Sequence, residues 1–221
     1  MNAISKISSA ASYARCYQLL AMAFAYPDAE TAGNMISGEY QRSLTAALLT
    51  AAPDLEALVT ARADGLSIAE TTGPMDIESA YMTAFEVETS KNAVSLYEGS
   101  HLGGCDRSQI LLEVKSFYLH FGLSVSDGLR EPEDHLPAEL EFMQFLAGKQ
   151  AMAEAEGSDA GAYVRAQRDF LDRHLTRWLP PFAKAAEGLD NNFYRTLAWM
   201  ADLLVMSHAE ILANQTEGAI A

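Results

Sequence analysis

The sequence predicts an all-α protein, folded as a compact helical bundle. Alanine, leucine, methionine and glutamate are abundant, and all four favour helix. Apolar residues recur at three- and four-residue spacing in successive segments, whereas the strict alternation typical of a half-buried strand is missing. The connections between these segments are short, which favours packing of successive helices in a bundle of roughly eight to ten helices.

In the first half of the chain, successive apolar stripes are separated by Pro and Gly. The first stripe includes Cys16, which we interpret as a small buried apolar residue. A loop follows the last of these helices, and it carries Tyr97, His101 and Cys105. Loops with such residues often have a functional role. The expected elements are helices at about 9–25, 38–50, 54–63 and 73–88, then a loop at 89–106.

The second half contains the longest apolar stripes. His174 lies on one of them, and we interpret it as a hydrogen-bonded core histidine. Pro180 and Pro181 are expected to end the helix that contains it. The expected elements are a helix at about 107–121, a connection at 123–133, a central helix from 134, a helix that begins near 159 and a last helix at 190–213.

The stretch from 129 to 143 predicts a loop that turns into this central helix. Pro132 favours an extended conformation at Glu131. Asp134 is the expected N-cap, because a short carboxylate can accept the free amide protons of the first turn. Pro137 then falls in the first turn, where its missing N–H is not needed. Apolar residues on more than one side indicate that several neighbours bury the helix.

Two residues of this stretch stand out, and they allow two interpretations. Glu139 lies on the apolar stripe, and His135 lies next to a loop rich in carboxylates. In the first interpretation, Asp134 caps the helix, His135 bonds locally and Glu139 meets a buried arginine. In the second, the loop lines a recognition cleft, and its carboxylates face a cationic partner.

Composition bounds the class of protein. A chain of 221 residues suits one domain or two small ones, and its 49% hydrophobic content is enough for a substantial core. The net charge of −15 disfavours nucleic acid and anionic membranes as partners, and it suits cationic segments. The two cysteines form no CxxC pair, which indicates a reducing compartment. We see no signal peptide and no apolar run approaching the ~20 residues of a membrane span, so we expect a cytoplasmic protein without stable membrane association.

Catalytic motifs are missing from the sequence. There is no GxGxxG, GxxxxGK[ST], GxSxG or HExxH pattern. No two histidines share one helical face at spacing for a metal, and only Cys105, His101 and His135 could converge as zinc ligands. We therefore expect no enzyme, no metal and no cofactor. The alternatives that remain open are a hydrolase or metal-dependent enzyme using His135 with the nearby carboxylates, and a structural subunit of a larger complex.

The pattern Glu-Pro-x-Asp-His-Leu-x-x-Glu-Leu-x-Phe-Met at 131–143 closely resembles the signature of the TorD/DmsD/NarJ family of molybdoenzyme maturation chaperones. The resemblance extends over about 13–182. Three stretches are most similar to the branch that serves type II enzymes of the dimethyl-sulfoxide-reductase family. Further matching stretches are 15–27 and 81–85, and the branch-specific ones are 96–100, 113–123 and 165–175.

This resemblance implies a single TorD-like all-helical domain over 1–221, with 123–133 as the candidate hinge. It implies a cytoplasmic chaperone, monomeric or a domain-swapped dimer, that binds the apo catalytic subunit of a type II molybdoenzyme. Family members often bind the twin-arginine signal peptide, and they hold back export until molybdenum cofactor is inserted. Some relatives have tryptophan at the places of Tyr81 and His101. The resemblance, with the motif's own carboxylates added, gives these client-binding residues: Tyr81, Phe85, Tyr97, His101, Glu131, Asp134, His135 and Glu139.

Overall fold

The computed structural model describes residues 9–69, 71–86, 92–124 and 132–218. Over these ranges the protein is helical apart from turns, loops and one isolated bridge, and the all-α prediction is confirmed. The α-helices are α1 (Ser9–Phe24), α2 (Ala29–Ile36), α3 (Glu39–Ala51), α4 (Glu56–Arg62), α5 (Pro74–Tyr81), α6 (Arg107–His120), α7 (Leu136–Glu156), α8 (Gly161–Phe170), α9 (Thr176–Ala186) and α10 (Asn192–Gly218). Short turns of helix are η1 (Pro53–Leu55), η2 (Ala63–Leu66) and η4 (Glu98–Ser100), and η3 (Met82–Glu86) and η5 (Leu171–Leu175) are π-helical.

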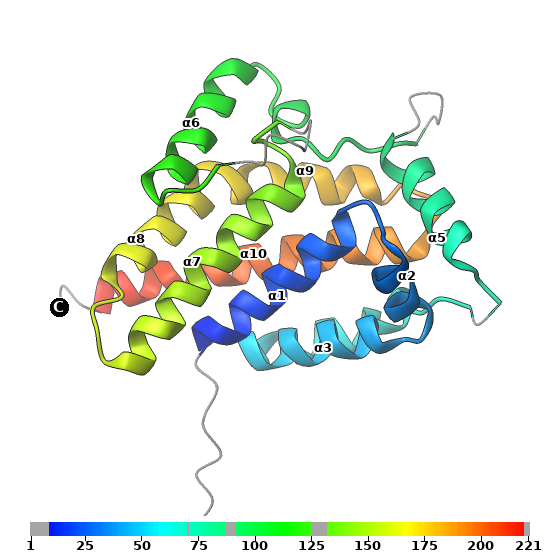
Figure 1. Ribbon diagram of the computed structural model, residues 1–221, viewed down its shortest axis with the longest axis horizontal. Coiled ribbons are helices and arrows are strands. Elements are labelled where there is room, and N and C mark those ends of the chain that lie inside the picture. The colour runs from blue at the N-terminus through cyan, green and yellow to red at the C-terminus, as the bar shows by residue number, and fades with distance from the viewer. Residues whose placement is uncertain (1–8, 70, 87–91, 125–131, 219–221) are drawn as a thin grey trace, which may run out of the picture.

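Helices α1 and α7 form the centre of the bundle. They run side by side across the front of the molecule, with α3 beside α1 and with α9 and α10 behind (Figure 1). The apolar stripe of α1 explains this position, since Cys16, Tyr17, Leu20 and Phe24 are all fully buried. Cys16 is a small buried apolar residue, as predicted, and burial raises the pKa of its thiol to about 12. The central role predicted for the helix after Pro132 is also confirmed.

Two expectations about helices were wrong. The sequence analysis left 29–36 without a helix, but α2 forms there, with Asp28 as N-cap accepting a hydrogen bond from the Thr31 amide at 2.7 Å. Pro180 and Pro181 were expected to end a helix, yet both lie inside α9. Trp178, Leu179 and Phe182 around them are fully buried. Burial of these three large side chains, at about 1.5–3 kcal/mol each, offsets the cost of the two interior prolines, at ~3 kcal/mol each.

Helix α10 is long and apolar enough, by length and composition, to cross a bilayer, which the sequence analysis did not anticipate. The stretch Asn192–Asn214 contains a window of 18 residues with a mean hydropathy of 1.2, and it is the one such stretch among the described residues. Half of that window is buried inside the molecule, including Leu197, Met200 and Leu204. A core helix passes the same test, and α10 is packed in this structure as a core helix.

The candidate hinge at 123–133 falls mostly on residues 125–131, which lie outside the described residues. Its role as a hinge stays a prediction. The buried side chains on either side of it, from α1 to α10, form one continuous cluster.

The packing of α10 on α1 buries a histidine between two tyrosines. His208 stacks on Tyr13 with ring centroids 3.8 Å apart, and its Nδ1 lies 2.9 Å from the Tyr17 hydroxyl. Burial lowers the pKa of His208 to about 3. The imidazole is therefore neutral in the folded protein at neutral pH.

This histidine should destabilise the protein at acidic pH. Unfolded His208 has its ordinary pKa of about 6.5, so between pH 6.5 and 3 the unfolded state binds more protons. Stability should fall with decreasing pH in this window, by up to about 1.4 kcal/mol per pH unit. Urea unfolding of the wild type and of His208→Gln at several pH values tests this. A wild-type slope equal to that of the variant would contradict it.

Candidate functional site

The loop before α6 is bound to the start of α7 by backbone hydrogen bonds. The Leu136 amide donates to the Leu96 carbonyl at 2.8 Å, and the Glu98 amide donates to the Asp134 carbonyl at 2.9 Å. Tyr97 and His135 form an antiparallel bridge between these bonds. The two stretches that the sequence singled out therefore lie side by side, although they are far apart along the chain.

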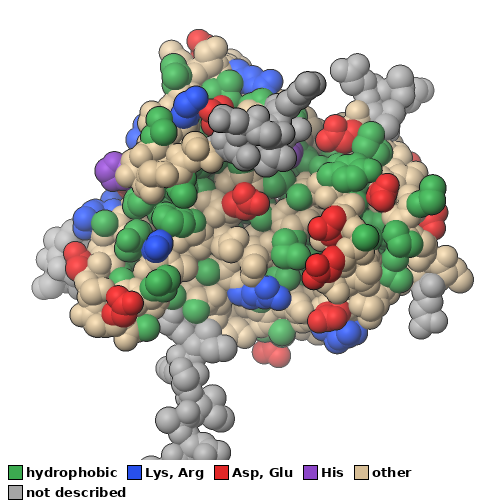
Figure 2. Space-filling view, in the orientation of Figure 1, with side chains coloured by type: hydrophobic (Ala, Val, Ile, Leu, Met, Phe, Trp, Pro, Cys, Tyr) green, Lys and Arg blue, Asp and Glu red, His purple; other side chains and the backbone are tan. Residues whose placement is uncertain are grey.

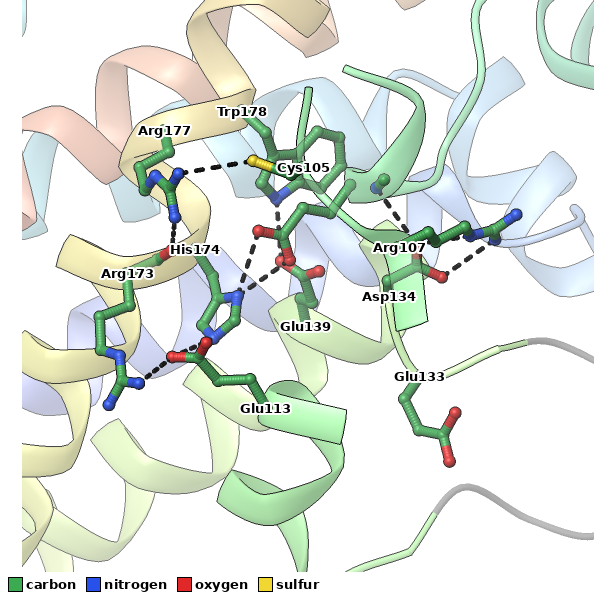
Figure 3. A network of polar contacts seen from close by, with 12 residues as sticks. Cys105, Arg107, Glu113, Glu133, Asp134, Glu139, Arg173, His174, Arg177 and Trp178 are labelled. Atoms are coloured by element: carbon green, nitrogen blue, oxygen red, sulfur yellow. Dashed lines mark hydrogen bonds and ion pairs between the residues drawn. The ribbon is translucent and has the colours of Figure 1, made fainter. Parts of the chain in front are cut away.

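Asp134 does not cap α7, and the N-cap prediction was wrong. His135 occupies the N-cap position, and its side chain makes no capping bond. The carboxylate of Asp134 is fully buried and turns back to the loop (Figure 3). It accepts hydrogen bonds from the Gly99 amide at 3.1 Å and from Arg107 Nε and Nη2, both at 3.2 Å. The Asp134 carboxylate thus makes a long-range ion pair in place of a local cap. Arg107 supplies charged donors to this carboxylate, and the Gly99 amide supplies a neutral one.

Glycine at position 99 allows this close approach. A Cβ atom there would lie 2.7 Å from Arg107 Cγ and 3.1 Å from Asp134 Oδ2. Any side chain would therefore push the arginine off the carboxylate. The Arg107 guanidinium also lies 5.1 Å from the centroid of the Tyr97 ring, close enough for a cation–π contact.

Tyr97 and His135 form an aromatic pair, with ring centroids 5.0 Å apart. His101 lies apart from them. Its ring stacks on Trp178 with centroids 5.5 Å apart, and its Nε2 is 2.7 Å from the Ser95 carbonyl. Burial lowers the pKa of His101, and this favours the neutral imidazole.

Beneath the loop lies a buried polar network that includes Glu139. The prediction that Glu139 meets a buried arginine was wrong: the Trp178 indole N–H donates to Glu139 Oε2 at 3.0 Å. Burial, and then the nearby Glu98 carboxylate, raise the pKa of Glu139 well above its usual range. His174 Nδ1 lies 2.9 Å from Glu98 Oε2, and its ring is 2% exposed, so the interpretation as a hydrogen-bonded core histidine is confirmed.

The network continues outward to the surface. His174 Nε2 lies 3.7 Å from Glu113 Oε1, and Glu113 pairs with Arg173 (Figure 3). Sequence reasoning missed Glu98, Glu113 and Trp178 as members of this network. Glu98 was within reach of inference, since it is a carboxylate between Tyr97 and Gly99 in a loop already singled out.

A cavity of about 690 Å³ opens beside His135, between the end of α1, η3, the end of α6 and the start of α7. Its walls are mainly apolar and aromatic. The two carboxylates are Glu86 and Glu141, and no lysine or arginine is among the described lining residues. The lining residues are Ala25, Tyr26, Tyr81, Met82, Glu86, Tyr118, Leu123, Ser124, His135, Pro137, Ala138, Glu141, Phe142 and Phe145.

The predicted site residues take different places around this cavity. Tyr81 and His135 line it, whereas Phe85 is buried behind Tyr81, with ring centroids 5.3 Å apart. The Tyr97 ring packs against the ring of His135 and is not among the residues that line the cavity. Glu131 lies outside the described residues. Asp134, His101 and Glu139 do not line the cavity. Their contacts hold the loop before α6 in place.

The cavity also contains residues that sequence reasoning missed. Glu141 is at its rim, reaching solvent, and partial burial raises the pKa of its carboxyl. Phe142 and Phe145 belong to the apolar sides of the predicted central helix, and the sequence did not indicate that they line a cavity. Glu133, one of the loop carboxylates expected to face a partner, instead forms an ion pair with Lys115 at 3.1 Å.

The zinc alternative has no support in the geometry. His101 faces Trp178, His135 faces Tyr97 and the cavity, and Cys105 Sγ lies 3.9 Å from Arg177 Nη2. Over the described ranges, no three histidine, cysteine or carboxylate side chains converge as metal ligands.

The fold and the site together define a helical binding protein with an apolar, acidic cavity. Residues 41–184 match the family described as nitrate reductase delta subunit, and the chain belongs to this NarJ/TorD family. It is 37% identical to the perchlorate reductase assembly chaperone protein of Dechloromonas aromatica (strain RCB), over 94% of this chain and 92% of that protein. It is 40% identical to the selenate reductase assembly chaperone protein of Thauera selenatis, over 63% of this chain and 72% of that protein.

A solved structure supports the fold alone. A redox enzyme maturation protein from Archaeoglobus fulgidus aligns with a TM-score of 0.50 and 19% identity, covering 87% of this chain and 93% of that one. The similar relatives are assembly chaperones and not catalysts, so the expectation that the protein is not an enzyme is confirmed.

Glu139 gives a prediction with a definite sign. Since its folded pKa lies above its unfolded value of about 4.5, the folded state binds more protons above that pH. The contribution of Glu139 to the free energy of unfolding of the wild type should therefore decline as the pH rises above 4.5. Glu139→Gln, which resembles the neutral acid, should remove this decline and keep the bond from Trp178.

Urea unfolding between pH 5 and 8 measures the effect. Glu139→Ala serves as the comparison, because it leaves the Trp178 N–H buried without an acceptor and should cost about 1–3 kcal/mol. A Gln variant as unstable as the Ala variant would show that the carboxylate is ionised.

Proposed function

We propose that this protein is a system-specific chaperone for assembly of a type II molybdoenzyme. It binds the apo catalytic subunit in the cytoplasm, and it holds back export until the molybdenum cofactor has been inserted. The family supports this proposal, and so do its relatives, since assembly chaperones for perchlorate, selenate and chlorate reductases are all similar to this chain.

The cavity beside His135 is the observation that carries the proposal. Its aromatic and aliphatic walls suit apolar side chains, and Glu86 and Glu141 suit a positive charge next to them. A twin-arginine signal peptide has a cationic start and an apolar middle, so it fits both parts. A chaperone must release its client, so we expect a dissociation constant on the order of micromolar, about −8 kcal/mol.

The predicted site residues divide into two roles in this proposal. Tyr81 and His135 contact the client, as does Glu131 by prediction. Tyr97 and Asp134 hold His135 and the start of α7 in place. Phe85, His101 and Glu139 support these residues from the buried side, since Phe85 and Glu139 are almost fully covered.

Affinity capture from cytoplasm distinguishes the proposal from a structural-subunit role. The tagged protein, expressed beside its molybdoenzyme, should capture the catalytic subunit without molybdenum cofactor. The readouts are protein identity by mass spectrometry and molybdenum content by elemental analysis. Capture of the active, cofactor-loaded enzyme would instead indicate a subunit of the mature complex.

Two substitutions test the cavity as the binding site. Glu141→Gln removes one negative charge, and His135→Gln keeps hydrogen bonding but removes the aromatic ring. Each should lower affinity for the client's N-terminal peptide about fivefold, or roughly 1 kcal/mol, because both groups are partly solvated. The wild-type affinity should also decrease with salt. Isothermal titration calorimetry gives both numbers.

Glu156→Gln is the matched control, since Glu156 is an exposed carboxylate at the other end of α7. It should leave the affinity unchanged. Equal losses in Glu141→Gln and Glu156→Gln would mean that only overall charge matters, and that the cavity is not the site.

A further inference from the structure

An exposed apolar stripe extends out of the cavity along α5. Met82 and Glu86 line the cavity, and Met82 is 38% exposed. Met75 is seven residues earlier, close to two helical turns, so it points to the same side, about 10 Å farther along the helix. Met75 is 82% exposed, the largest value among the exposed large apolar residues that the structure describes.

Carboxylates accompany these methionines. Glu78 lies between Met75 and Met82, and its Oε2 accepts a hydrogen bond from the hydroxyl of Tyr26 at 3.1 Å. Tyr26 itself lines the cavity and is 57% exposed. Among the described residues, neither Glu78 nor Glu86 has a basic side chain within ion-pair distance. The stripe therefore offers apolar contact and negative charge together.

The surface view shows the same combination of side chains. Hydrophobic and acidic side chains adjoin one another over α5 and the end of α1, and the lysines and arginines of this face lie elsewhere (Figure 2). Like the cavity, the stripe is apolar and carries carboxylates, and the two surfaces adjoin at Met82 and Glu86. A segment that fills the cavity would meet a matching surface where it leaves.

We propose that Met75, Glu78, Met82 and Glu86, with Tyr26, form a docking track that binds the continuation of the client's cationic and apolar segment beyond the cavity. This inference rests on the proposed function, and it names where the rest of the segment lies. Charge complementarity and continuity with the cavity identify the occupant. Methionine side chains are flexible and polarisable, so they can adapt to apolar segments of different sequence.

The dimensions set the length of client involved. An extended peptide advances about 3.3 Å per residue, so the distance from Met82 to Met75 corresponds to roughly three client residues. A short peptide should fill the cavity alone, and a longer one should also reach the track. The two peptides therefore separate the cavity from the track.

The test uses two synthetic peptides that begin with two arginines and continue with leucine and alanine, of roughly 6 and 14 residues. Met75→Ser combined with Glu78→Gln should weaken binding of the long peptide about tenfold and leave the short one unchanged. Met152→Ser is the control, because Met152 on α7 is also an exposed methionine, at 56%. It should change neither affinity. Circular dichroism checks that each variant is folded.

A photoreactive amino acid at position 75 gives a second readout on the full chain. It should cross-link the long peptide, whereas the same group at position 152 should not. Unchanged affinity of the long peptide in the double variant, or equal cross-linking at both positions, overturns the track. If Glu141→Gln still lowers the affinity for both peptides, the cavity assignment and the proposed function stand without the track. If the wild type binds neither peptide, both the track and the cavity assignment are overturned, while capture of the apo catalytic subunit still tests the chaperone role separately.

Discussion

The arrangement of the site depends on the connection between the loop at 96–99 and the first residues of α7. Two backbone hydrogen bonds join them, and the buried carboxylate of Asp134 adds the Gly99 amide and the Arg107 guanidinium. Without this connection the loop would lose its bonds to α7 and keep its own turn, η4, and the contacts of Glu98 with His174 and of His101 with Trp178. With it, Tyr97 supports His135, and His135 forms one wall of the cavity.

A buried polar network stabilises the same loop from inside. Glu98 and Glu139 are fully buried, and so is nearly all of His174. Buried ionisable groups are unfavourable unless each is paired or neutral. Here the Glu98 carboxylate has His174, and Glu139 has the Trp178 N–H together with a raised pKa that favours its neutral form. Since these partners come from η4, α7, η5 and α9, the network fixes how four elements meet beneath the loop.

The sequence predicted most of the helices, and it singled out the two stretches that meet at the candidate site, because both depend on local patterns. Apolar spacing placed α1, α6, α7 and α10, and the motif around Asp134 and His135 marked the start of α7. The partner of Asp134 could not be predicted, since a cap is a local preference whereas Arg107 reaches the carboxylate through the tertiary fold. Pro180 and Pro181 were misleading because burial of their neighbours offsets the local effect of the two prolines. The cavity residues Met82 and Glu141 required knowledge of which helices meet, and an apolar stripe alone does not give it.

Hydrogen–deuterium exchange of the wild type and of Asp134→Ala tests most directly whether this connection organises the site. In the wild type, the amides of Glu98, Gly99 and Leu136 should be protected nearly as well as those of the central helix α1. In Asp134→Ala these three amides should exchange faster, α1 should keep its protection, and binding of the apo catalytic subunit should weaken in parallel. Unchanged exchange at the three amides together with normal client binding would contradict the account.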